Sequence, residues 1–234
     1  MSHYAVVASM FLPLHDENPL KIVPYQRVTM SLIGLNIVLF VLMYGAGSDA
    51  FLAHIEHWGL RPVSLTYGIP ASEQNSAGWF SWLSYMFLHA GWGHLLGNMA
   101  CLWVFGDNIE DSMGHRRFLL FYALCGLAAA ATHYVADPNS PVPMIGASGA
   151  IAGVMGAYLV LHPKVKVWVL VFMRIPLKLP VVFPLSIWFG LQWLSLGQPG
   201  VAWWAHIGGF VAGAVLIVVM RDPRIPLFDQ GVKH

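Results

Sequence analysis

Residues 147–161 read ASGAIAGVMGAYLVL, an uncharged run of mostly small and apolar side chains. A bilayer core about 30 Å thick needs roughly 20 apolar residues at 1.5 Å per residue, whereas this run spans only about 22 Å as a helix. A helix formed here cannot cross a membrane unaided and is expected to begin or end inside it. The run opens on the hydroxyl of Ser148, and Gly149, Gly153 and Gly156 follow in a pattern typical of closely packed helices.

The rest of the chain has the composition of a membrane protein. Of its 234 residues, 57% are hydrophobic and 10% are charged, against roughly 45 to 50% and about 25% in soluble domains. The formal net charge of +1 gives no field that would attract nucleic acid, so no such partner is expected. Cys101 and Cys125 lie in apolar runs without metal-ligand spacing, and we expect neither a metal nor another cofactor.

Six stretches are long or apolar enough to enter the bilayer. They are residues 28–45, 87–105, 118–135, 147–161, 181–196 and 201–220. We therefore expect an all-α polytopic membrane protein with a bundle of six transmembrane helices.

The basic residues predict the orientation, because Lys and Arg are enriched in cytoplasmic loops. Of the twelve basic residues, only Arg61 lies in a segment on one side of these six spans. The eleven on the other side are Lys21, Arg27, Arg116, Arg117, Lys164, Lys166, Arg174, Lys178, Arg221, Arg224 and Lys233. We expect a cytoplasmic N-terminal segment at 1–27, a membrane domain at 28–220 and a cytoplasmic tail at 221–234.

Two connections between the spans are themselves rich in apolar residues. In the external connection, 47–86, aromatic and aliphatic residues alternate with polar ones, which predicts interfacial helices on the outer leaflet. The internal connection, 162–180, is apolar but interrupted by basic residues and prolines, and we expect it to be interfacial as well.

A polar side chain inside a membrane is costly, so it is a functional hypothesis by default. The second span carries His89, His94 and Asn98, and the last two are four residues apart on one helical face. If a helix starts near Ser148, its hydroxyl and the free backbone N–H groups around it suit a nucleophile whose attack creates an oxyanion.

The sixth span supplies a possible base. His206, Gly209 and Gly213 share a face that is otherwise bare of side chains and could press against the small face of 147–161. An imidazole held against Ser148 could take the hydroxyl proton and return it to a leaving group. Each feature also has a simpler interpretation, the glycines as a packing stripe and the histidine as a helix-to-helix hydrogen-bonding group.

Taken together, these motifs resemble the rhomboid family of intramembrane serine proteases. The motifs are His89-x4-His94-x3-Asn98, Gly146-x-Ser148-Gly149, Ala205-His206-x2-Gly209-x3-Gly213 and Glu110-x3-Gly114-x2-Arg117-Phe118. They occur in the family's order, and the resemblance covers about three quarters of the chain.

The resemblance implies a role for each residue. Ser148 would be the nucleophile, His206 the general base and acid, and the pair a dyad without a carboxylate. His94, Asn98 and the backbone N–H of Ser148 would form the oxyanion hole, and His89 would be structural. The implied enzyme is a serine endopeptidase of a bacterial inner membrane that cleaves transmembrane or juxtamembrane segments of membrane proteins, with the lipid bilayer as its other partner.

Two positions depart from the family pattern. Trp82 is followed by Leu83 where many members have arginine, and Arg61 could supply an anchoring role instead. Ala152 stands where some members have a Tyr or Phe stacked on the catalytic histidine, so the positioning of His206 needs another explanation.

Two other functions fit part of the pattern. A transporter would also use a short, glycine-broken span and intramembrane histidines, but the two halves of the chain share no evident repeat and the spans lack Asp and Glu. A non-catalytic binder of membrane helices would not require both Ser148 and His206. For a protease, we expect an externally open polar cavity lined by His89, His94, Asn98, Ser148 and His206.

Overall fold

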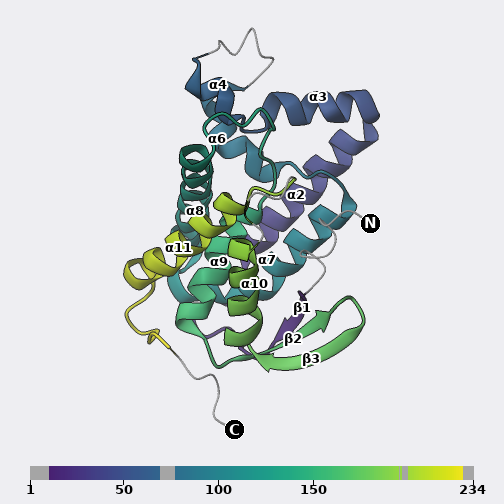
Figure 1. The fold of residues 1–234 in the computed structure, drawn as a ribbon. Coiled ribbons are helices and arrows are strands. Elements are labelled where there is room, and N and C mark those ends of the chain that lie inside the picture. Colours follow the sequence, from purple (N-terminus) through teal and green to yellow (C-terminus); the bar gives the residue numbers. More distant parts are fainter. Residues whose placement is uncertain (1–10, 69–76, 195, 197–199, 229–234) are drawn as a thin grey trace.

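A computed structural model describes residues 11–68, 77–194, 196 and 200–228. A helix lies at each of the six expected stretches (Figure 1). They are α2 (Arg27–Gly45), α7 (Trp92–Met113), α8 (His115–Ala136), α9 (Ser148–Leu161), α10 (Val182–Leu194) and α11 (Trp203–Met220). By length and composition, α2, α8 and α11 could each cross a membrane, while α9 and α10 are shorter apolar helices. The expected all-α membrane bundle is confirmed, with a small sheet added to it.

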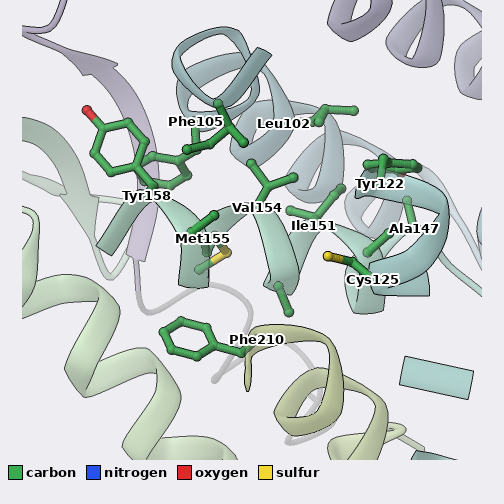
Figure 2. Close-up of a cluster of buried hydrophobic side chains, with 14 of the residues drawn as sticks. Leu102, Phe105, Tyr122, Cys125, Ala147, Ile151, Val154, Met155, Tyr158 and Phe210 are labelled. Carbon is green, nitrogen blue, oxygen red and sulfur yellow. The ribbon is translucent and has the colours of Figure 1, made fainter. Parts of the chain in front are cut away.

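The short helix α9 lies at the centre of the bundle. Every residue from 149 to 158 is buried, and α7, α8 and α11 pack around it (Figure 1). Figure 2 shows side chains of Ile151, Val154 and Met155 among those of Phe105 and Phe210 from neighbouring helices. Because α9 is apolar on every side, it is stable only when other helices surround it completely.

Glycines allow α9 and α11 to approach with their backbones in contact, as the sequence predicts. A Cβ atom on Gly209 would lie 1.9 Å from the carbonyl oxygen of Gly149, and one on Gly213 would lie 1.9 Å from that of Gly153. No side chain fits in such a gap, so glycine is required at both positions of α11. This prediction of close contact between the two small faces is confirmed.

The helix α7 differs from the predicted span at both ends. It begins at Trp92, after a 3-10 turn, η2 (Tyr85–Phe87), and runs past residue 105 to Met113. The added turns carry carboxylates that remain buried because they accept backbone hydrogen bonds. Glu110 accepts from the N–H groups of Val28 (2.9 Å) and Thr29 (2.8 Å), and so caps the first turn of α2.

The neighbouring carboxylate, Asp111, anchors the segment that precedes α2. Its oxygens accept hydrogen bonds from the backbone N–H groups of Lys21 (2.7 Å), Ile22 (2.7 Å) and Val23 (2.6 Å). Burial without such partners would be costly for an ionised group. These acidic side chains therefore fasten the N-terminal segment to the end of α7.

The sequence does not predict the three-stranded antiparallel sheet at this end of the bundle. Its strands are β1 (Phe11–Asp16), β2 (Lys166–Val171) and β3 (Ile175–Pro180), in the order β1-β2-β3. Thus the internal connection, expected to be simply interfacial, contains a hairpin, and residues before the first helix add a strand to it. In Figure 1 the sheet lies at the opposite end of the molecule from α3 and α4.

A buried polar cluster joins this sheet to the end of α9. Asp16 accepts hydrogen bonds from the Tyr158 hydroxyl and from Nδ2 of Asn108 (3.1 Å). Burial raises the pKa of Asp16 to about 7. A cavity of about 770 Å³ lies beside the cluster, between β1, α7 and the residues that lead into β2.

The helices expected in the external connection are present. They are α3 (Ser48–Trp58), α4 (Pro62–Thr66), the 3-10 turn η1 (Gly78–Phe80) and α6 (Ser81–Ser84). Leu60 forms a β-bridge with Met144, and Thr66 Oγ1 donates to the carbonyl of Pro138 at 2.6 Å. These bonds tie the external connection to the loop that leads into α9.

Candidate active site

The nucleophile candidate, Ser148, is the first residue of α9. The preceding turn is held by a hydrogen bond from the N–H of Gly146 to the carbonyl of Tyr85 at 2.9 Å. Gly146 has φ +114°, a conformation that favours glycine. Because Ser148 is in the first turn, its backbone N–H has no carbonyl partner within the helix. This N–H and the side-chain hydroxyl therefore lie together at the positive end of the helix dipole.

The imidazole of His206 meets this hydroxyl. Nε2 of His206 lies 2.8 Å from Oγ of Ser148, although the residues are 58 positions apart. The contact depends on the glycine seam, the close packing of Gly209 and Gly213 of α11 on Gly149 and Gly153 of α9. Gly209 lies one turn after His206 and packs on the carbonyl of Gly149. Both side chains are partly exposed, and the pair can therefore be reached from outside the packed core.

His94, on α7, directs a proton toward the same place. The N–H of Ala90 lies 3.3 Å from Nδ1 of His94 and donates to it, so a neutral imidazole carries its proton on Nε2. A Cβ atom on Gly146 would lie 2.8 Å from this Nε2 and 3.6 Å from Oγ of Ser148. The space beside Gly146 thus lies between an N–H donor and the nucleophile.

Two further polar residues near His94 are buried: Asn98 lies one turn later on α7, and His89 packs against the ring of His94. Asn98 is 8% exposed, and its Nδ2 has no hydrogen-bond partner among the described residues. His89 is 1% exposed, and its ring centroid lies 5.1 Å from that of His94. His94, Ser148 and His206 keep exposed surface, whereas His89 and Asn98 are buried, and a cavity lined by all five residues stays a prediction.

Sequence reasoning missed one residue at this site, Gln192 of α10. Its Oε1 lies 2.8 Å from Nδ1 of His206, and it is 1% exposed. The available signal was the single amide side chain in the largely apolar span 181–196, because a polar group inside a membrane is costly.

The two departures from the family pattern have local counterparts. Trp82 stacks on Trp79 (6.4 Å between ring centroids) and meets the ring of Tyr134 on α8 (6.1 Å). Arg61 forms an ion pair with Glu56 within the external connection. Ala152 is fully buried in α9 and presents no ring to His206.

Aromatic rings from α10 and from the first turn of α11 approach His206 instead. The ring centroid of Trp188 lies 5.7 Å from that of His206 at 38°, and the ring centroid of Trp203 lies 6.2 Å away at 88°. Within the part of the chain that the structure describes, no three His, Cys, Asp or Glu side chains gather as they would around a metal ion. The chemistry available here is that of a hydroxyl, an imidazole and hydrogen-bond donors.

Comparisons with known proteins agree with this arrangement. Residues 76–223 match the rhomboid domain family. The chain is 29% identical over 203 residues to the rhomboid protease GluP of Bacillus subtilis, covering 86% of this chain and 36% of that protein. It is 41% identical over 81 residues to the putative rhomboid protease YdcA of Bacillus subtilis, covering 35% of this chain and 40% of that protein.

The similarity extends beyond bacteria. The human rhomboid-related protein 3 is 28% identical over 221 residues, covering 89% of this chain and 52% of that protein. The matched segments cover less than half the length of either Bacillus relative.

Proposed function

The chain belongs to the rhomboid family, and on this premise we propose that it is an intramembrane serine endopeptidase that cuts membrane proteins within or beside their transmembrane segments. Ser148 is the nucleophile and His206 the general base and acid. The observation that carries the proposal is the 2.8 Å contact between Nε2 of His206 and Oγ of Ser148. An imidazole at that distance can remove the hydroxyl proton as the oxygen attacks.

Three donors would stabilise the developing oxyanion. They are Nε2–H of His94, Nδ2–H of Asn98 and the backbone N–H of Ser148. An amide donor that is buried without a partner, like that of Asn98, costs about 1 to 3 kcal/mol. An oxyanion that forms only during the reaction would accept its hydrogen bond at the moment when this stabilises the transition state.

The reaction proceeds in two halves. In the first, Ser148 Oγ bonds to the scissile carbonyl carbon, its proton passes to His206, and the carbonyl oxygen becomes the oxyanion. The C–N bond then breaks as His206 gives that proton to the leaving amine, which leaves an acyl ester on Ser148. In the second half, His206 takes a proton from water, the resulting hydroxide attacks the ester, and the proton returns to Oγ.

Substrates of this site would be membrane helices that unwind easily. A protease needs an extended backbone, whereas a membrane helix keeps its amides bonded internally. Gly or Pro near the cleavage site lowers the cost of unwinding. Replacing those residues by Leu in a cleaved substrate should slow its cleavage.

The distribution of basic residues supports an orientation with both termini in the cytoplasm and the site open to the outside of a bacterial inner membrane. Ser148→Cys protein should then react with a membrane-impermeant thiol reagent added externally. Cys101, which is partly exposed, is replaced by Ala for this experiment, whereas Cys125 is fully buried. Labelling from the cytoplasmic side alone would show that the orientation is the reverse of the proposed one.

Covalent labelling tests the proposed nucleophile most directly. A fluorophosphonate reacts with a serine whose proton is removed by a base, and not with an ordinary buried hydroxyl. Wild-type protein should be labelled at Ser148 and should cleave a model transmembrane substrate. Ser148→Ala and His206→Ala should each abolish labelling and cleavage, and the double variant should be no worse, because residues that act as one unit are non-additive.

Ser112 provides the matched control. It is a buried serine of α7 whose hydroxyl donates to the carbonyl of Ile109 at 2.8 Å. Ser112→Ala should be labelled and active like wild type. Wild-type protein that binds membrane helices but takes no label would support a non-catalytic binder, and cleavage by Ser148→Ala would exclude the proposed dyad.

A further inference from the structure

The imidazole of His206 is bonded through both of its nitrogens. While Nε2 faces Ser148, Nδ1 lies 2.8 Å from Oε1 of Gln192. The other end of the Gln192 amide, Nε2, donates to the carbonyl of Trp188 at 3.0 Å, one turn earlier in α10. A continuous chain of hydrogen bonds thus runs from the backbone of α10 through the amide and the imidazole to the serine.

These hydrogen bonds determine which atoms carry the protons. A backbone carbonyl only accepts, so the NH₂ group of Gln192 must face Trp188 and the amide oxygen must face His206. An amide oxygen also only accepts, so Nδ1 of His206 carries the ring proton. The lone pair of Nε2 is then directed at the hydroxyl of Ser148, as a general base requires.

We propose that Gln192 is a positioning residue that holds His206 in the productive tautomer and orientation, a role that rests on the proposed function of the Ser148 and His206 pair. This role explains how His206 is held in place although Ala152 offers it no stacking ring. Trp188 lies beside the imidazole of His206, and its carbonyl orients the amide. The same turn of α10 therefore supplies both a ring contact and a fixed acceptor.

An amide suits this position better than a carboxylate. Gln192 is almost fully buried in an apolar helix, where an ionised carboxylate would carry a large desolvation cost. The amide oxygen has only a partial negative charge, yet its hydrogen bond strengthens when the imidazole becomes protonated during the reaction. Gln192 thereby supplies the orienting function that a carboxylate serves in other serine hydrolases.

Two substitutions separate positioning from packing. Gln192→Leu keeps the volume but removes the acceptor, and we expect kcat to fall on the order of 100-fold with KM unchanged. Fluorophosphonate labelling of Ser148 should slow by a similar factor. Gln192→Glu restores an acceptor and should recover most of kcat, but the acidic limb of its kcat profile should move to higher pH because a carboxylate favours the charged imidazole.

Other groups near His206 are unchanged in these variants. The titratable side chains whose charge acts on His206 are His94 of α7 and His133 of α8. Both histidines are present in wild type and in Gln192→Glu, so a difference between the two pH profiles is caused by the new carboxylate.

Asn36 of α2 is a matched control for the loss of a buried amide. It is fully buried, and its Nδ2 donates to the carbonyl of Leu32 at 2.8 Å, four residues earlier, as Gln192 does to Trp188. Asn36→Leu should keep the wild-type kcat. The inference is overturned if Gln192→Leu keeps wild-type kcat and labelling, or if Gln192→Glu is as slow as Gln192→Leu with no shift of its pH profile. Wild-type protein that takes no label would instead refute the proposed function, and this inference with it.

Discussion

The two ends of α9 carry polar clusters of opposite kinds. Near its last turn, Tyr158 donates to Asp16, and the adjacent Asp111 of α7 accepts three backbone hydrogen bonds. Near its first residue, Ser148, the amide nitrogen of Asn98 has no partner among the described residues, and neither does either ring nitrogen of His89. The carboxylates of the first cluster are satisfied by the fold, whereas the second holds buried nitrogen atoms that have no partner among the described residues.

The difference separates stability from reactivity. A buried polar group that is fully hydrogen-bonded rigidifies the structure, while an unpaired one costs about 1 to 3 kcal/mol. At Asn98, the proposed oxyanion would provide the missing partner. Substitutions near Ser148 should therefore lower the cleavage rate. Substitutions near Tyr158 should instead lower the stability against unfolding.

The glycine seam connects both ends, so breaking it should have the largest effect. Gly209→Ala places a methyl group 1.9 Å from the carbonyl oxygen of Gly149, and α11 must move away from α9. We expect a loss of several kcal/mol in stability and no detectable cleavage, because His206 moves with the helix. Thermal unfolding in detergent and a cleavage assay measure the two effects. In Gly34→Ala, the added methyl group meets no atom within 4 Å, so normal folding and cleavage are expected.

Asn98→Ala should lower the rate without lowering stability. Several donors share the oxyanion charge, and losing one typically costs ~100 to 1,000-fold in rate. Because Nδ2 of Asn98 has no partner in the resting protein, its removal should leave the unfolding temperature unchanged. If Asn98→Ala protein cleaves at the wild-type rate in detergent and in membranes, Asn98 is not part of the site.

Glu110→Ala should show the reverse signature. It leaves the N–H groups of Val28 and Thr29 at the start of α2 without an acceptor, and we expect a destabilisation of about 2 to 4 kcal/mol. The cleavage rate of each folded molecule should stay within about twofold of wild type. Glu110→Gln retains one side-chain carbonyl. Its unfolding temperature should lie between those of wild type and Glu110→Ala. A Glu110→Ala protein with lower kcat but normal stability would contradict the division between the two ends.

The smallest expected effect is a pH dependence of stability at Asp16. Burial raises the pKa of this carboxyl from its usual value of 3.8 to about 7. The folded protein therefore holds this proton at pH values where the unfolded chain has lost it, and the group stabilises less as pH rises toward 7. We expect the protein to lose on the order of 2 kcal/mol between pH 5 and pH 8 from this source.

Asp16→Asn isolates this contribution. The amide cannot ionise, so stability should become less dependent on pH in thermal unfolding across the same range. A slope equal to that of wild type would show that another group is responsible. Cleavage at a fixed pH should be unaffected, because Asp16 lies at the end of α9 remote from Ser148.

Much of the site was predictable because its residues follow local rules. His94 and Asn98 share a helical face by their spacing, and the short apolar run places Ser148 at a helix start. The seam was predictable too, since small residues at helical spacing indicate close packing. Gln192 was not, because no spacing rule links a glutamine on α10 to a histidine on α11.

The rest of the fold depends on partners far apart in the chain. Hydropathy ends the second span at 105, although α7 continues to Met113, because backbone groups of the N-terminal segment satisfy Glu110 and Asp111. The sheet was missed for the same reason, since β1 pairs with β2, which lies far away in the sequence. Single-sequence patterns register local periodicity and carry no information about such pairings.

The late position of His206 also affects biosynthesis. A ribosome makes Ser148 first, and the base follows 58 residues later, on the last helix that the structure describes. Until α11 emerges and packs against α9, the serine has no partner to take its proton. If Ser148 and His206 form the proposed dyad, a nascent chain lacks activity until the bundle is assembled.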